Sequence, residues 1–217
     1  MDFDRKNFWD KKILGWESDR YKESKTINNS SLQYRLNIIQ HILKKLPKNS
    51  RVLEIGCGSA LSLDLIKESR DIHYTGIDIS ERAIENAKSK YSEIDNFNFI
   101  ATDISNFTPN QEYDFCFSLG LLDWISLSEI KQIKEKIQTK YYLHSYSEKR
   151  QSIEQFIHQI YVFIAYAYKT KNYKPAYYSQ DAIGKIFHRP SFYRNKKLSF
   201  GTLVYNLPTE LKEDILL

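Results

Sequence analysis

The segment Arg51–Ala60, Arg-Val-Leu-Glu-Ile-Gly-Cys-Gly-Ser-Ala, constrains the fold more than any other stretch of the 217-residue chain. Apolar residues before Gly56 predict a short buried strand, and apolar spacing from Leu61 predicts a helix through Glu68. Glycines at the turn between them remove the Cβ atoms that would keep a ligand from the backbone. A helix start also offers unpaired N–H groups, so the pattern indicates a ligand site or a tightly packed turn.

Two later strands end on acidic residues. The predicted strand His73–Asp78 ends on a carboxylate about twenty residues after the glycine turn. A third predicted strand, Phe97–Ala101, is followed by Asp103. In nucleotide-binding βαβ units, the acid after the second strand accepts hydrogen bonds from ribose hydroxyls. Of the two interpretations of the glycine turn, the acids therefore favour a ligand site and not a turn that is only tightly packed.

Four segments resemble, in order and spacing, the motifs of class I methyltransferases that use S-adenosylmethionine, specifically the small-molecule type. They are Glu54–Ala60, Gly76–Ser80, Ala101–Ile104 and Tyr113–Gly120. The resemblance covers residues 30–145. It implies an α/β fold: a seven-stranded, mostly parallel, doubly wound sheet with an antiparallel C-terminal hairpin strand and helices on both faces. The alternation of predicted strands and helices independently favours a parallel sheet.

A nicotinamide oxidoreductase is the competing interpretation of the same turn. That class has a Gly-x-Gly-x-x-Gly series, and Gly56–Leu61 lacks its last glycine. It also gives Asp103 no role, so the methyltransferase is preferred.

The chain is expected to form a single domain of residues 1–217. Residues 1–29 are predicted as an N-terminal cap segment of short helical turns and loops, and 30–146 as the cofactor-binding core. Residues 147–190 are predicted as a helical, aromatic substrate-lid insertion, and 191–217 as the C-terminal hairpin. Within the insertion, 152–169 has a helical period, and its wide apolar arc predicts burial.

The resemblance also assigns the cofactor S-adenosylmethionine, with S-adenosylhomocysteine as its product. It implies that Glu54 organises the glycine loop, that Asp78 holds the ribose, and that Asp103 holds the adenine amine. Arg35, with Tyr21 as a weaker candidate, is expected either to hold the methionine carboxylate or to be exposed. The full expected set is Tyr21, Arg35, Glu54, Gly56, Cys57, Gly58, Asp78, Ile79, Asp103, Ile104, Ser118 and Leu119.

Methyl transfer needs in-line positioning, plus a base where the acceptor carries a proton. Asp123, after the fourth strand, and His144, in the fifth, are the candidate catalytic bases. Each has a structural alternative, because Asp123 could cap the next helix and His144 could be a core histidine.

The expected acceptor is an oxygen or nitrogen of a small molecule, such as a sugar nucleotide or natural-product precursor. An RNA or protein methyltransferase and a non-catalytic cofactor-binding partner subunit remain alternatives. The net charge of +5 is modest and lysines are scattered, so nucleic acid is not an expected partner. No apolar stretch approaches the roughly 20 residues of a membrane span, so no membrane partner and a cytoplasmic location are expected. No metal site is expected, and the chain should be a monomer or homodimer.

Overall fold

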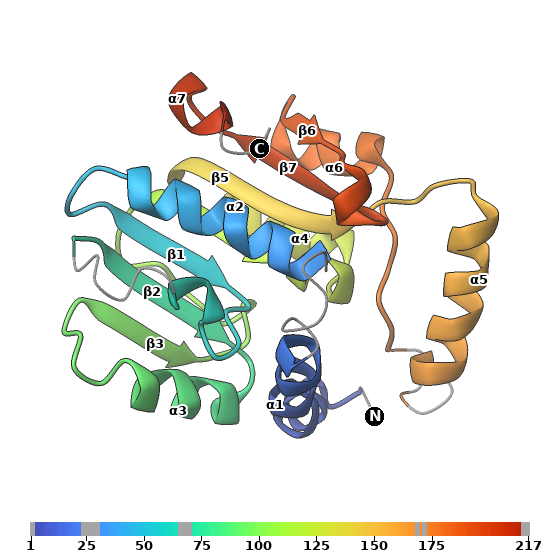
Figure 1. The fold of residues 1–217 in the computed structure, drawn as a ribbon, viewed down its shortest axis with the longest axis horizontal. Coiled ribbons are helices and arrows are strands. Elements are labelled where there is room, and N and C mark those ends of the chain that lie inside the picture. Colours follow the sequence, from blue (N-terminus) through green and yellow to red (C-terminus); the bar gives the residue numbers. More distant parts are fainter. Residues whose placement is uncertain (1–2, 23–30, 65–70, 168–169, 171–172, 214–217) are drawn as a thin grey trace.

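The computed structural model describes residues 3–22, 31–64, 71–167, 170 and 173–213. Seven strands form one sheet in the order β3-β2-β1-β4-β5-β7-β6 (Figure 1). The strands are β1 (Arg51–Ile55), β2 (His73–Asp78), β3 (Phe97–Ala101), β4 (Tyr113–Leu119), β5 (Thr139–Ser147), β6 (Ser191–Tyr193) and β7 (Gly201–Asn206). Strands β1 to β5 pair in parallel, and β7 runs antiparallel to both β5 and β6. The predicted sheet is confirmed.

Two apolar cores lie on opposite faces of this sheet. Helices α2 (Ser31–Lys45) and α3 (Glu81–Lys90) pack into one core through Ile39, Ile42 and Ile84. Helices α4 (Leu127–Lys136) and α6 (Gln180–Phe187) pack into the other, while the short α7 (Thr209–Lys212) follows β7. Both faces of the central strands are therefore covered, as their apolar sequences require.

Serine side chains start the helices where the sequence predicts. Ser80 Oγ accepts a hydrogen bond from Ala83 N at the start of α3, and Ser179 does the same for α6. Ser126 and Glu129 form a reciprocal capping box on α4. Such caps satisfy backbone N–H groups that a helix end leaves without partners.

The N-terminal segment differs from the prediction of short turns and loops. Its described part forms the helix α1 (Arg5–Lys22), which has no apolar stripe and is attached to the body by polar pairs as well as by aromatic contacts. Arg5 bonds Glu129, and Asp10 accepts a hydrogen bond from Ser80 Oγ. After the glycine turn, the described chain forms only the 3₁₀ turn Leu61–Leu63, and the rest of the predicted helix, 65–68, lies outside the described residues.

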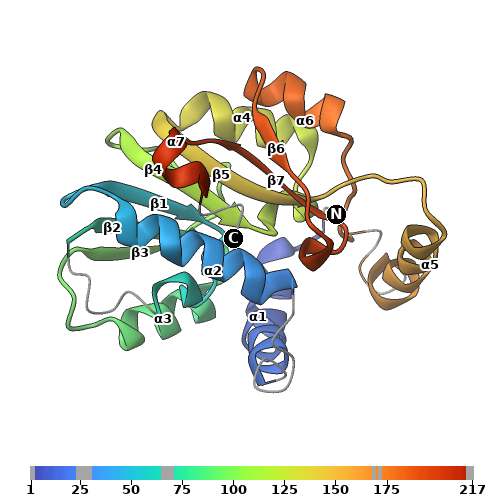
Figure 2. The same cartoon turned by 45° about the horizontal axis from the view of Figure 1, so that its top comes forward.

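The predicted helix in the insertion is confirmed, but its predicted burial is wrong. Helix α5 (Ile153–Val162) starts at Ser152 and continues as a π-helical turn, Phe163–Ala167. Figures 1 and 2 both show α5 standing apart from the sheet, joined to it by extended segments. Most of its large apolar side chains are exposed. No helix in the described part of the chain is long and apolar enough to cross a membrane.

Candidate functional site

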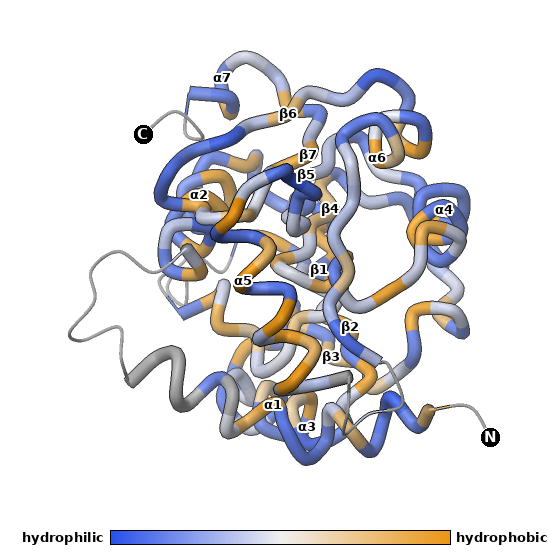
Figure 3. Tube along the Cα trace, turned by 90° about the vertical axis from the view of Figure 1, so that its right-hand side faces the viewer, coloured by the Kyte–Doolittle hydropathy of each residue, from blue (hydrophilic) through white to orange (hydrophobic). Residues whose placement is uncertain are grey.

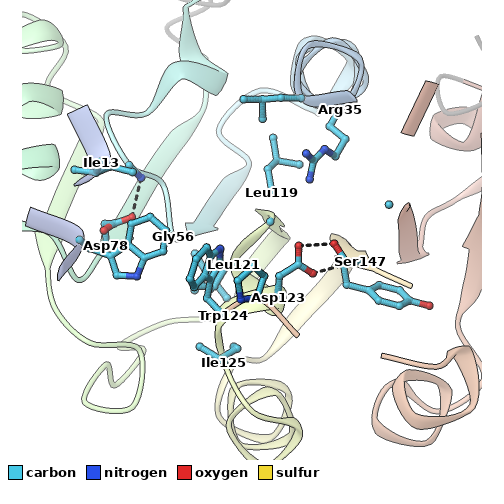
Figure 4. Close-up of a pocket in the computed structure, with 18 of the residues that line it drawn as sticks. Ile13, Arg35, Gly56, Asp78, Leu119, Leu121, Asp123, Trp124, Ile125 and Ser147 are labelled. Atoms are coloured by element: carbon cyan, nitrogen blue, oxygen red, sulfur yellow. Dashed lines mark hydrogen bonds between the residues drawn. The ribbon is translucent and has the colours of Figure 1, made fainter. Parts of the chain in front are cut away.

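A cavity of about 370 Å³ opens at the carboxyl ends of the parallel strands. Its walls come from the glycine turn after β1, the ends of β2, β3 and β4, the helices α1 and α2, and the insertion (Figure 4). Strand order reverses between β1 and β4, and open α/β sheets bind ligands at such a point.

Left-handed backbone conformations shape the turn after β1. Gly56 and Gly58 have φ angles of 70° and 53°, which glycine adopts without steric cost. A Cβ on Gly56 would lie 3.1 Å from Leu121 Cβ, and one on Gly58 would collide with Glu17 Oε1. Gly56 N and Cys57 N both donate to Ile77 O, so the turn is fixed to the end of β2.

Asp78 holds the turn from the neighbouring strand. Its Oδ2 accepts a hydrogen bond from Gly58 N at 2.9 Å, and its Oδ1 accepts one from Ser80 N at 2.9 Å. Burial, opposed by these bonds, raises the pKa of Asp78. An ionised carboxylate has about four acceptor positions, so Asp78 retains capacity for a ligand. Ile79 lies beside it in the cavity wall.

Asp103 and Ile104 line the cavity at the end of β3. Oδ1 of Asp103 accepts hydrogen bonds from Ser105 N and Ser105 Oγ, each at 2.8 Å. No described residue bonds Oδ2 of Asp103. That oxygen is therefore available to a ligand.

Two further acids lie against the glycine turn. Glu54, on β1, is buried and accepts hydrogen bonds at 2.5 Å from Ser62 Oγ and Tyr74 OH. Burial raises the pKa of Glu54 to about 8, with the negative charges of Asp78 and Glu17 adding to the effect. Glu17 reaches in from α1 and accepts from Ser59 N at 2.9 Å, and burial raises its pKa too. Burial thus disfavours the charged forms of these acids, which a cation bound beside them would stabilise.

Arg35 faces the cavity from α2, near the end of β4 (Figure 4). Its Nε donates to Ser31 O and its Nη1 donates to Ser145 Oγ, both at 3.0 Å. These bonds place the guanidinium over Gly120, whose missing Cβ would lie 3.6 Å from Nη1. These contacts hold the Arg35 side chain at the cavity, so Arg35 is not simply an exposed surface residue.

Asp123 lines the cavity in the 3₁₀ turn Leu121–Trp124 and faces Ser147 (Figure 4). It accepts hydrogen bonds from Ser147 N at 2.5 Å and Ser147 Oγ at 2.9 Å. Burial raises the pKa of Asp123 to about 6. It does not cap the next helix, because Ser126 does.

The structure does not bring His144 to the cavity. His144 is buried in the core, where its ring stacks on Tyr142 and its Nδ1 lies 3.0 Å from Ser118 Oγ. Burial lowers the pKa of His144 to about 3. The core alternative therefore describes this histidine, and the prediction of a catalytic base there is withdrawn. Its partner Ser118, predicted to contact the cofactor, is likewise outside the cavity wall.

The structure thus brings together most of the predicted site. The cavity wall includes Arg35, Glu54, Gly56, Cys57, Gly58, Asp78, Ile79, Asp103, Ile104, Leu119 and Asp123. Cys57 is a buried free thiol whose pKa burial raises, in keeping with a packing role. The side chain of Tyr21 lies outside the described residues.

A family model described as a methyltransferase domain matches residues 46–165, more than half of the chain. The chain belongs to this family. A malonyl-[acyl-carrier protein] O-methyltransferase of Ilyobacter polytropus is 35% identical over 92 residues, which are 42% of this chain and 33% of that protein. A protein of Arabidopsis thaliana named "Probable thiol methyltransferase 2" is 33% identical over 85 residues, 37% of each chain. The chain thus spans about a third of the length of these curated relatives.

Solved structures share the fold. A magnesium protoporphyrin IX methyltransferase from Synechocystis, solved with bound S-adenosylhomocysteine, aligns with a TM-score of 0.65 at 15% identity. The alignment covers 92% of this chain and 96% of that chain. The predicted class I architecture is therefore shared along nearly the whole chain.

Sequence reasoning missed several residues that line this cavity. Trp9 of α1 donates through Nε1 to Tyr173 OH at 3.0 Å, and its ring packs on Trp124 at 4.8 Å. The predicted lid tyrosines Tyr161, Tyr166, Tyr173 and Tyr177 also lie in the wall. The sequence showed that the N-terminal segment and the insertion are rich in aromatic residues. It did not show that these residues come into contact beside the cavity.

Proposed function

We propose that this chain transfers a methyl group from S-adenosylmethionine to an oxygen or nitrogen of a small molecule. The observation that carries the proposal is the convergence of the glycine turn, Asp78 and Asp103 on one cavity at the carboxyl ends of β1 to β3. Family membership supports the activity, and the name of the Ilyobacter relative makes oxygen the first acceptor atom to test.

The acidic wall fits the charge of this cofactor. S-adenosylmethionine carries a sulfonium and an ammonium group, both positive. Burial raises the pKa values of Glu54, Glu17 and Asp78, and nearby negative charges add to each shift, so a bound cation would favour their ionised forms. In the proposed complex Glu54 and Glu17 hold the amino end of the methionine moiety, while Arg35 holds its carboxylate.

Carboxylates at the ends of β2 and β3 suit the adenosine moiety. Asp78 would accept from the two ribose hydroxyls with the oxygen capacity it retains. Ile79 would pack on the adenine, whose exocyclic amine would donate to Oδ2 of Asp103. The backbone N–H of Ile104 would face a ring nitrogen of the adenine, and Leu119 would line the methionine side of the site.

The insertion and the aromatic residues would form the acceptor side. Bound S-adenosylmethionine supplies an electrophilic methyl group, so the chain has to orient the acceptor and remove its proton where there is one. Asp123 suits the second task, because its pKa of about 6 leaves it ionised at neutral pH while it remains a fair base. Ser147 fixes its orientation through two hydrogen bonds.

We assign the outer segments of the single domain accordingly. Helix α1, in the predicted cap segment, contributes Trp9, Ile13 and Glu17 to the cavity wall. It would cover the cofactor. Residues 147–190 would act as the substrate lid. Two residues of this segment, His158 on α5 and Tyr177, form a hydrogen bond of 2.5 Å beside the cavity, which supports that role.

The experiment is methyl transfer from radiolabelled S-adenosylmethionine to a panel of small hydroxy, carboxy and amino compounds. Asp123→Asn should lower turnover by roughly a hundredfold or more with cofactor affinity retained. Asp114→Asn, at the opposite end of β4, is the matched control and should keep full activity. Equal turnover in Asp123→Asn and the control would remove the base assignment, and absence of transfer to the whole panel would favour a non-catalytic or macromolecular role.

A further inference from the structure

The outer face of α5 is the largest exposed apolar feature among the described residues. It consists of seven large side chains, each between 47% and 80% exposed: Ile153, Phe156, Ile157, Ile160, Tyr161, Phe163 and Ile164. Together they expose on the order of 700 Å², more than the few hundred Å² of contiguous apolar surface usual for a monomer. Figure 3 shows hydrophobic turns of α5 on this side of the molecule.

The outer face points away from the body of the protein. At helical spacing, Ile153, Ile157 and Ile160 fall on the side opposite to Gln155 and Val162. The latter two are buried against the rest of the chain. Closing α5 over the cavity would therefore leave the outer face in solvent, so whatever covers it comes from outside the described chain.

The sequence segment that carries the outer face is strongly basic. Residues 149–174 contain five basic residues, Lys149, Arg150, Lys169, Lys171 and Lys174, and one acid, Glu154. This segment of 26 residues thus holds +4 of the net charge of +5. Among the described members, Lys174 places its Nζ 5.3 Å from the ring centre of Phe163, at the edge of the face.

The geometry points to docking of the outer face of α5 on an anionic lipid surface. An apolar helix face in a basic segment, with Lys174 at its edge, combines insertion among acyl chains with attraction to acidic headgroups. A second copy of the chain fits less well, because pairing two outer faces would bring two segments of charge +4 together. At 10 residues, α5 would lie in the interface and not cross it. This surface contact differs from the expectation of no membrane partner, which rested on spanning segments alone.

Docking would also bring the cavity to the lipid. Tyr161 belongs to the outer face and to the cavity wall, and Tyr166, one turn further, lines the cavity. An acceptor with an apolar tail could then pass along α5 from the bilayer to Asp123. This consequence, unlike docking itself, rests on the proposed function.

The test is co-sedimentation of the full chain with vesicles of phosphatidylcholine alone and of equal parts phosphatidylcholine and phosphatidylglycerol. Wild type should bind the anionic vesicles, and added salt should weaken binding. The double variant F156S/I160S should bind at least about tenfold more weakly. Leu127→Gln removes an exposed apolar side chain on α4 and is the matched control, with binding unchanged. The replaced side chains are exposed, so equal thermal unfolding of all three proteins is expected.

Two results would overturn the proposal. One is failure of wild type to bind anionic vesicles, or equal binding by F156S/I160S. The other is a dimer, measured by light scattering without lipid, that F156S/I160S dissociates, because a second copy would then cover the face. Since no methyl acceptor or cofactor enters the assay, its outcome is independent of whether methyl transfer is found.

Discussion

Replacing Glu54 by glutamine should change how the stability of the ligand-free protein depends on pH. Glutamine keeps an oxygen that can accept from Ser62 and Tyr74 but cannot ionise. In the wild type, burial raises the pKa of Glu54 from its ordinary 4.5 to about 8. Between those values the folded protein keeps a proton that the unfolded chain releases, so rising pH favours unfolding. The destabilisation is absent below about pH 4.5 and complete above about pH 8.

One pKa unit corresponds to about 1.4 kcal/mol, so wild type should lose on the order of 3 kcal/mol more than Glu54→Gln between about pH 5 and pH 8. Urea unfolding at a series of pH values measures this difference. Glu17 and Asp78 contribute in both proteins, so the comparison isolates Glu54. Glu112→Gln, at an exposed turn, is the control and should follow wild type. Parallel pH profiles for wild type and Glu54→Gln would refute the reasoning.

Three further predictions concern the glycine turn, the core histidine and the cofactor charge. Gly58→Ala adds a Cβ at φ 53° that collides with Glu17, and urea unfolding should show a loss of about 1–2 kcal/mol, whereas unchanged stability would mean that α1 does not sit on the turn. His144 is neutral when folded because its pKa is lowered to about 3, so stability falls as pH drops below 6.5. Between about pH 7 and pH 5, His144→Gln should lose about 2 kcal/mol less unfolding free energy than wild type, and its turnover per folded molecule should be unchanged. Calorimetry in two buffers of different ionisation enthalpy should detect proton release when S-adenosylmethionine binds at pH 7, and Glu54→Gln should reduce it.

The resemblance of four short motifs to those of a known family implied the sheet and most of the cavity, because both depend on short segments. The turn Gly56–Gly58 and the acids Asp78 and Asp103 each follow a strand directly, and parallel strands bring their carboxyl ends together. Because β1, β2 and β3 pair in parallel as expected, these residues lie at the same edge of the sheet. Serine caps likewise fixed helix starts, because the cap acts within three residues.

The predictions failed where a segment's partners are distant in the sequence, or where the sequence pattern does not determine what surrounds a side chain. Helix α1 carries no apolar period, and its bonds through Arg5 and Asp10 reach partners 124 and 70 residues away, which a local pattern does not show. His144 faces Ser118 of the neighbouring strand, and only the paired register shows that it points into the core. For α5, the apolar period indicates that one face of the helix favours an apolar environment. It does not show whether protein or an outside surface covers that face.

The central claim is that the cavity binds S-adenosylmethionine through Asp78. Calorimetric titration with S-adenosylmethionine and S-adenosylhomocysteine tests it most directly, using wild type, Asp78→Ala and the control Asp114→Ala. Wild type and Asp114→Ala should bind both ligands at roughly micromolar affinity, and Asp78→Ala should bind at least about tenfold more weakly. Absence of binding to wild type, or equal binding by Asp78→Ala, would contradict the account.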